Sequence, residues 1–281
     1  MAIFHGNAIP SGASGYDIPN SLRFNDDDSA YLSRTPSVAG NRKTWTWSGW
    51  VKRGNLTGTE LYVLTSGTGN SGWTEYIRFN GDNTLTFSLA KSNASNGRLA
   101  TNQVFRDTSA WYHIICVHDS SNSTAGDRIR LYVNGSRLTG TDLSTETMPS
   151  LNDDSLFINN TGKHALGQFV YNSSGYLDGY LAEVNFVDGQ ALTPADFGET
   201  DATYGHWKAI AYTGTYGTNG YYLDFKDSGS LGNDANGSNN WTPTNLAVTD
   251  QMLDSPTNNF ATWNPLAIDG NNHNGSLSEA S

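Results

Sequence analysis

The chain has few basic residues and a single cysteine. Its 281 residues include 16 Lys and Arg against 27 Asp and Glu, which leaves a formal net charge of −11. Nucleic-acid-binding proteins neutralise phosphates with clustered Lys and Arg, so this composition excludes that class, and it disfavours an anionic membrane as a partner. The one cysteine, Cys116, has no second cysteine to pair with, and we expect it to be a small buried side chain.

Long apolar runs are also missing. No stretch approaches the roughly 20 apolar residues that a membrane span needs. The first ten residues, MAIFHGNAIP, contain no basic region followed by an apolar core, so no secretory signal is visible. We therefore expect no membrane insertion, and a soluble product made in a cytoplasm.

The most informative stretch is 111–138, WYHIICVHDSSNSTAGDRIRLYVNGSRL. Within each half, two sets of residues alternate along the chain with a period of two, which is typical of strands with one buried face. Seven polar or small residues, 120–126, separate the halves. The dipeptide Asn134-Gly135 favours a type I′ turn, because both central positions of that turn need a positive φ. The stretch predicts a β-hairpin with a tight return turn.

Similar runs recur at intervals of about ten residues, the rhythm of an antiparallel sandwich. We expect strands at 21–24, 30–33, 44–54, 60–65, 74–79, 85–90, 156–159, 166–171, 177–187 and 221–226. A capping threonine followed by proline predicts one short helix at 193–197. Within the run at 44–54, we expect Trp45 and Trp47 to lie in the core, and the sequence does not decide whether Trp50 does.

The chain ends differ in composition from its centre. Since sandwiches of 200–250 residues form single domains, we assign 21–227 to one sandwich. Residues 1–20 contain no Lys or Arg and are broken by Pro and Gly, which predicts an extended arm. No Lys or Arg occurs after residue 226, and Asn recurs, so we expect 228–281 to be an irregular Asn-rich tail or a linker to a further domain.

The arm is predicted to dock on a neighbouring subunit instead of folding onto its own sandwich. Its apolar side chains offer too little contiguous surface for a core. These residues are Ile3, Phe4, Ile9 and Ile18. The alternative is a loose end without a role, because chain termini are often mobile unless tied down.

Three segments carry a family resemblance. The hairpin, the run TWTWSGWVKRG and the later run YLDGYLAEVNFVDGQALTPADF resemble, in this order, the laminin-G-like domains of the concanavalin A-like lectin/glucanase superfamily. The resemblance implies an all-β, antiparallel sandwich of the concanavalin A-like jelly-roll type. It implies little about chemistry, because fold and function are separable.

Glucanases of that superfamily use a Glu-x-Asp-x-x-Glu strand, whose alternation aims two carboxylates at one sugar. That spacing does not occur here: Glu183 stands alone, and Glu199 with Asp201 lies in a loop-like stretch. His113 and His118 are five residues apart, so on one strand they face opposite sides, which is poor zinc geometry. We therefore expect no enzymatic activity.

Calcium is the one cofactor that the resemblance raises, since laminin-G-like relatives sometimes bind it through loop Asp and Asn oxygens. Asp153 and Asp154, in the run 152–154, are the candidate ligands, and the acidic run 26–28 offers similar groups. Neither run has the spacing of an Asp-x-Asp-x-Asp-Gly loop, so solvated acidic turns are the favoured interpretation.

A second resemblance lies in the last part of the chain and in two early segments. The segment 220–266, together with AIPSGASGYDIPNSLRF and YLSRTPSVAGNRKTWTWSGWVKRG, is similar to segments of structural proteins of aquatic bacteriophages. It implies a virion protein of a tail, fibre or capsid-associated kind, active in assembly or host attachment. The implied partners are other virion proteins, further copies of the chain in a homo-oligomer and a host surface glycan.

For glycan adhesion, the candidate side chains are Trp73 and Tyr76, which we expect to be exposed aromatic residues. Two alternatives remain open at this point. One is a carbohydrate-binding adhesin or lectin without a virion role, and the other is a glycan-cleaving enzyme.

Overall fold

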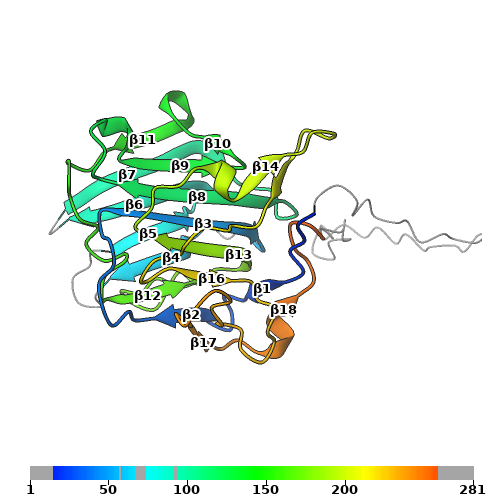
Figure 1. Ribbon diagram of the computed structural model, residues 1–281. Helices are drawn as coiled ribbons and strands as arrows, with labels where there is room; N and C mark the ends of the chain where they lie inside the picture. The colour runs from blue at the N-terminus through cyan, green and yellow to red at the C-terminus, as the bar shows by residue number, and fades with distance from the viewer. Residues whose placement is uncertain (1–14, 57, 68–73, 92–93, 259–281) are drawn as a thin grey trace, which may run out of the picture.

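The chain folds into two antiparallel sheets that face each other, as the computed structural model in Figure 1 shows. It describes residues 15–56, 58–67, 74–91 and 94–258. Helix in this described part is limited to short 3-10 turns: η1 (Ala125–Asp127), η2 (Gly140–Asp142), η3 (Pro194–Asp196) and η4 (Val248–Asp250). The predicted all-β, antiparallel sandwich is confirmed. None of the helices described is long and apolar enough to cross a membrane.

The two large sheets contain strands from the whole described chain. Sheet A has the order β10 (Ser136–Arg137), β9 (Ile129–Val133), β8 (Trp111–Asp119), β3 (Thr44–Arg53), β13 (Gly179–Asp188), β1 (Ser21–Phe24) and β18 (Gln251–Met252), and β16 (Tyr221–Leu223) also pairs with β13. Sheet B has the order β11 (Leu143–Thr147), β7 (Ala94–Val104), β6 (Thr84–Lys91), β5 (Thr74–Phe79), β4 (Leu61–Gly67), β12 (Lys163–Leu166), β2 (Tyr31–Arg34) and β17 (Thr242–Thr244). A separate ribbon of β14 (Gly198–Thr200) and β15 (Trp207–Ala209) projects from the sandwich (Figure 1).

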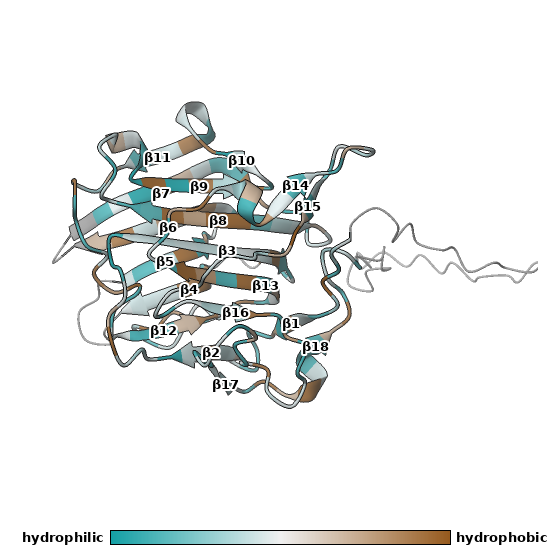
Figure 2. Ribbon diagram, in the orientation of Figure 1, coloured by the Kyte–Doolittle hydropathy of each residue, from teal (hydrophilic) through white to brown (hydrophobic). Residues whose placement is uncertain are grey.

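The core forms where the period of two turns apolar residues inward. On β3, Trp45 and Trp47 are fully buried between the sheets, as predicted. Trp50 points to the other side of sheet A, where it packs in a second cluster with Trp111. Figure 2 shows brown, hydrophobic stretches on the central strands β8 and β13, the neighbours of β3. One strand therefore serves both faces of its sheet.

The predicted hairpin is present. β8 and β9 pair antiparallel, and β9 returns into β10 through the two residues Asn134 and Gly135. Their φ angles are 47° and 79°, so both central positions adopt the left-handed conformation that a type I′ turn requires. A Cβ atom on Gly135 would lie 2.5 Å from the ring of Trp207, so the turn also sits against the β14–β15 ribbon.

Two predicted strands are wrong. The run 156–159 forms turns, because a buried carboxylate on β5 takes up its backbone donors: Glu75 accepts the N–H groups of Leu156, Phe157 and Ile158. The run 166–171 ends its strand at Leu166, since the chain turns at Gly167 with a φ of 84°.

The arm prediction needs a correction for residues 15–20. Ile18 is 0% exposed and packs against Trp50 and Trp111 of its own sandwich. Its backbone N–H donates to Thr257 Oγ1 over 2.8 Å. Sequence alone could not show this, because the apolar partners come from distant strands. The other predicted arm residues, Ile3, Phe4 and Ile9, lie outside the described residues.

The boundary expected at residue 227 also differs from the structure. Leu231 and Trp241 belong to the main core, although the composition indicated an irregular tail. β17 pairs with β2, and β18 pairs with β1, so these late strands cover edges of both sheets. The sandwich therefore continues through the described part of this region, to residue 258.

Both ends of the described chain lie side by side (Figure 1). Ser21 pairs with Met252 across the sheet edge, and the Ser21 hydroxyl donates to the backbone oxygen of Asp254 over 2.5 Å. The Asp254 carboxylate accepts from Lys52 Nζ over 2.6 Å and from Trp111 Nε1 over 3.1 Å. These bonds fix the last residues against sheet A.

Candidate functional site

The outer side of sheet B carries a cluster of aromatic rings, which we call the Tyr76 face. Its members are Tyr62, Tyr76, Arg78, Phe169 and Tyr171. The ring centroids of Tyr62 and Phe169 are 4.4 Å apart and stacked, and those of Tyr62 and Tyr76 are 5.7 Å apart and edge to face. Tyr171 lies 6.1 Å from Phe169 and is 40% exposed. The rings thus form one connected cluster, in which Tyr62 is buried beneath its neighbours.

Strand alternation places Tyr76 and Arg78 there. Ile77 and Phe79, their neighbours on β5, are fully buried in the core, so the even-numbered residues face outward. Tyr76 and Arg78 are half-buried. The sequence predicts that Tyr76 is exposed, whereas the structure has it half-buried, and Trp73 lies outside the described residues.

A loop completes the face. Phe169 and Tyr171 follow β12, and this loop is tied to the sheet by the Thr65 hydroxyl, which donates to the Gln168 carbonyl over 2.8 Å. The Phe169 N–H donates to the Ser174 carbonyl over 2.8 Å, which closes the loop on itself. The loop is therefore held in place under its aromatic side chains.

Polar groups border the rings. The Arg78 guanidinium lies 4.6 Å from the ring centroid of Tyr76 and 5.4 Å from that of Tyr62. It also donates to the Tyr62 hydroxyl over 2.7 Å and pairs with Glu60 over 2.6 Å. Burial is the main cause that raises the pKa of Tyr62, so its hydroxyl stays protonated at neutral pH. Rings with polar edges suit a ligand that has apolar faces and hydroxyl groups.

The calcium candidates do not converge on one point. The Asp153 carboxylate accepts the backbone N–H of Ser150 over 3.2 Å, and the Asp154 carboxylate pairs with Arg42 over 3.4 Å. The described residues contain no group of three or more His, Cys, Asp or Glu side chains placed to hold a metal ion. The geometry of these two residues gives the calcium prediction no support.

Ser48 and His113 form a pair that resembles a nucleophile and its base. His113 Nε2 lies 2.8 Å from Ser48 Oγ, and the Trp207 indole donates to His113 Nδ1 over 2.9 Å. Because Nδ1 accepts a hydrogen bond, it carries no proton, so Nε2 of the neutral ring carries one and donates to the serine. Burial lowers the pKa of His113 to about 3, so the ring stays neutral. The pair fixes the β14–β15 ribbon and does not activate the serine.

Glu183 is buried at an irregular point of β13, where its φ is 51°. Its described bonding partners are two tyrosine hydroxyls: Tyr222 donates over 2.8 Å, and Tyr16 donates to the other oxygen. Burial raises the pKa of Glu183 to about 7. Glu199 and Asp201 instead share Lys208, each at 3.2 Å.

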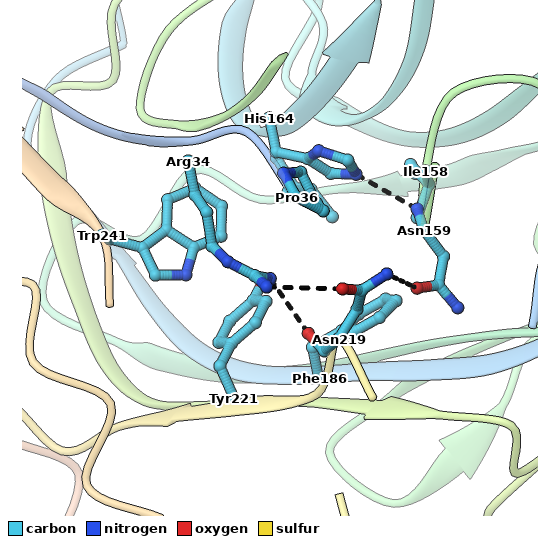
Figure 3. Close-up of a pocket in the computed structure, with 10 residues that line it drawn as sticks. Arg34, Pro36, Ile158, Asn159, His164, Phe186, Asn219, Tyr221 and Trp241 are labelled. Carbon is cyan, nitrogen blue, oxygen red and sulfur yellow. Dashed lines mark hydrogen bonds between the residues drawn. The ribbon is translucent and has the colours of Figure 1, made fainter. Parts of the chain in front are cut away.

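A small hollow opens between the two sheets (Figure 3). It encloses about 270 Å³ between its lining atoms, part of which is open to solvent. The lining residues are Arg34, Pro36, Leu64, Ile158, Asn159, His164, Phe186, Asn219, Tyr221 and Trp241. His164 Nδ1 donates to the Gly162 carbonyl over 2.9 Å, and its Nε2 accepts the Asn159 N–H over 3.1 Å. Burial lowers the pKa of His164 to about 4, so this ring is neutral too.

The sequence indicated Tyr76 as a candidate binding residue but did not indicate the other members of the Tyr76 face. The alternation in 60–65 and 74–79 was sufficient to indicate that Tyr62 and Arg78 face the same way as Tyr76. Phe169 and Tyr171 gave no such signal, because the loop that carries them meets β4 only in the folded chain.

Comparisons with known proteins found similar solved structures. A search of curated proteins found no match. Among solved structures, a putative carbohydrate binding protein from Bacteroides ovatus is 16% identical with a TM-score of 0.52, over 81% of this chain and 58% of that one. A heptameric SAP-like pentraxin from Limulus polyphemus is 18% identical with a TM-score of 0.44, over 64% of this chain and 80% of that one. Tailspike protein 2 of an Escherichia coli bacteriophage is 14% identical with a TM-score of 0.43, over 67% of this chain and 24% of that one.

The family model described as the concanavalin A-like lectin/glucanases superfamily matches residues 24–197. This range contains the hairpin and both flanking segments that resemble laminin-G-like domains. It includes every residue of the Tyr76 face. Because the match spans more than half of the sequence, the chain belongs to the concanavalin A-like lectin/glucanases superfamily.

Proposed function

We propose that this chain is a non-catalytic, glycan-binding module of a bacteriophage particle. The observation that carries the glycan-binding part is the Tyr76 face, where partly exposed rings are bordered by an arginine and a carboxylate. The apolar faces of a sugar ring pack on aromatic side chains, while its hydroxyl groups bond to the charged groups beside them. The lectin-like fold supports this role, since glycan binding is common among proteins with this architecture.

The glycan test compares two exposed tyrosines. We expect the wild-type protein to bind a subset of glycans on an array of host surface saccharides, and Tyr76→Ala to lose most of that signal. Tyr204→Ala is the matched control, because Tyr204 is 65% exposed on the connection between β14 and β15 and lies outside the face. Equal signals from both variants would place the binding elsewhere, and no binding by wild type would refute the glycan role.

The virion role is supported by the resemblance of 220–266 and of the two early segments to phage structural proteins. In this proposal the protein is made in the host cytoplasm and becomes part of the tail, fibre or capsid, in contact with other virion proteins and with copies of itself. Mass spectrometry of purified particles should detect it at a fixed ratio to the major capsid protein. Its absence from clean particles would favour a lectin or adhesin without a virion role.

The absence of catalysis is the third part of the proposal. Its support is the arrangement of the carboxylates: Glu183 is bonded to two tyrosines, and Glu199 and Asp201 share a lysine. We expect no release of reducing sugar from common β-glucans. Release that disappears in Glu183→Gln would show that the module is an enzyme.

A further inference from the structure

The Arg34 guanidinium occupies the hollow between the sheets without a carboxylate partner. Figure 3 shows its end among the side chains of Trp241, Tyr221 and Asn219. Nη1 donates to the Asn219 carbonyl over 3.0 Å, and Nη2 donates to Asn219 Oδ1 over 3.4 Å and to Asn239 Oδ1 over 2.5 Å. These acceptors are all neutral. No ion pair involves Arg34 in the part of the chain that the structure describes.

The guanidinium has donors left over. It carries five N–H groups. The three bonds to Asn219 and Asn239 leave Nε–H and one Nη1–H without an acceptor among the described residues. A second donor of the hollow, the indole N–H of Trp241, is buried and has no partner among the described residues. Since buried donors are normally bonded, this indole and the half-buried guanidinium beside it offer donors to an incoming acceptor.

The nearby acids are already engaged. The Asp188 carboxylate accepts from the N–H of Asn41, the side-chain amide of Asn159 and the N–H of Asn219. Asp234 accepts three backbone N–H groups and acts on Arg34 only through its charge. His164 is neutral, and both of its ring nitrogens are bonded. The positive charge of Arg34 therefore dominates the hollow.

A purely structural role accounts for only part of this arrangement. Arg34 does hold the loops at 219 and 239, but neutral N–H donors could donate bonds of the same kind to these oxygens. Placing a cation among apolar walls is costly unless it meets an opposite charge. Leu64, Ile158 and Phe186 supply such walls.

We propose that the hollow binds one carboxylate group of a small acidic ligand, with Arg34 as its cationic partner. The free space at its centre is about that of one water molecule, so it can take one carboxylate oxygen, with the second oxygen in the open part of the hollow, and it is too small for a sugar ring. The rest of the ligand lies outside, towards solvent. This site is separate from the Tyr76 face and does not depend on it.

The test follows the Trp241 indole and His164 ring signals by NMR in the whole chain. Sodium acetate should shift both signals in a saturable way, whereas acetamide and an equal concentration of sodium chloride should not. Glucuronate should bind more tightly than acetate if the natural ligand is an acidic sugar, and no tighter if it is another carboxylate. Either result supports a carboxylate site.

Two variants locate the binding. Arg34→Gln should weaken acetate binding about tenfold or more, since a charge-assisted hydrogen bond is worth about 1.5–3 kcal/mol. Arg42→Gln is the matched control, because Arg42 pairs with Asp154 outside the hollow, and it should bind acetate like wild type. Tyr76→Ala should bind acetate normally, so this proposal and the glycan role fail independently.

The proposal is overturned if wild type gives no saturable response to acetate or glucuronate, or if chloride gives the same response. Equal binding by Arg34→Gln and wild type overturns it as well. The wild-type titrations decide the matter even if Arg34→Gln does not fold.

Discussion

Replacing Glu75 by glutamine changes one oxygen of a buried carboxylate into an amino group. Glu75 is 0% exposed and accepts five hydrogen bonds. Oε1 accepts the N–H groups of Ala90 and Leu156, and Oε2 accepts those of Phe157 and Ile158 together with the Ser155 hydroxyl. Whichever way the glutamine is turned, its amino group faces two backbone donors.

The expected loss follows from those two donors. An unsatisfied buried donor costs about 1–3 kcal/mol, so Glu75→Gln should lower the free energy of unfolding by about 2–6 kcal/mol. Burial raises the pKa of Glu75 and its hydrogen bonds oppose that shift, so losing the buried charge offsets part of the cost. We therefore expect a loss at the lower end, and a Tm lower by about 5–10 °C.

Thermal unfolding by circular dichroism measures the effect, and amide hydrogen exchange locates it. Exchange should accelerate at Leu156, Phe157 and Ile158. Glu146→Gln is the control, because Glu146 is exposed on β11 and its replacement should change stability by less than about 0.5 kcal/mol. A Tm for Glu75→Gln equal to or above that of wild type would refute the assignment of this carboxylate as the anchor of the loop.

Three further outcomes are expected. Gly135→Val should lower the free energy of unfolding by more than about 1 kcal/mol, because its Cβ is strained at positive φ and collides with Trp207; an unchanged Tm contradicts this. The folded-state pKa of Glu183, about 7, lies above its ordinary value of 4.5, so the native state keeps the proton to higher pH than the unfolded state does. Wild type should therefore lose stability relative to Glu183→Gln as pH rises from about 4.5 to 7, by up to about 3 kcal/mol, and parallel stability profiles of the two proteins against pH would refute this. Deleting 1–20 removes the buried Ile18 and should lower Tm. Deleting 1–14 should leave Tm nearly unchanged and abolish incorporation into particles, so normal incorporation of that protein would contradict the arm hypothesis.

The strands that sequence predicted best are those whose pattern is local. The run 74–79 matches β5 at both ends, and Asn134-Gly135 turns as expected, because alternation and turn chemistry depend on adjacent residues. β7 was missed, since its sequence ASNGRLATNQV is polar and lacks a clear period. Its pairing partners, β6 and β11, supply the ladder on both sides.

The features that sequence could not supply depend on contacts between distant residues. Leu156 and Ile158 look like strand residues, and only the position of Glu75, about 80 residues earlier, shows why they are not. Tyr76 could be predicted, but its neighbour Phe169 could not, because the stacking on Tyr62 exists only after folding. The same holds for the hollow, to which Arg34 and Trp241 come from opposite ends of the chain.

Several acidic side chains stabilise loops of the fold from buried positions. Glu75, Asp188 and Asp234 are all buried, and each is satisfied by N–H or O–H donors of loops instead of by a cation. A buried carboxylate that collects several such donors orders a loop that has no strand ladder of its own. Long irregular connections can then pack onto the sandwich with few Lys and Arg residues. Arg34 is a half-buried arginine whose acceptors are all neutral and which lines a hollow that is partly open to solvent, so we propose it as the position where an external anion binds.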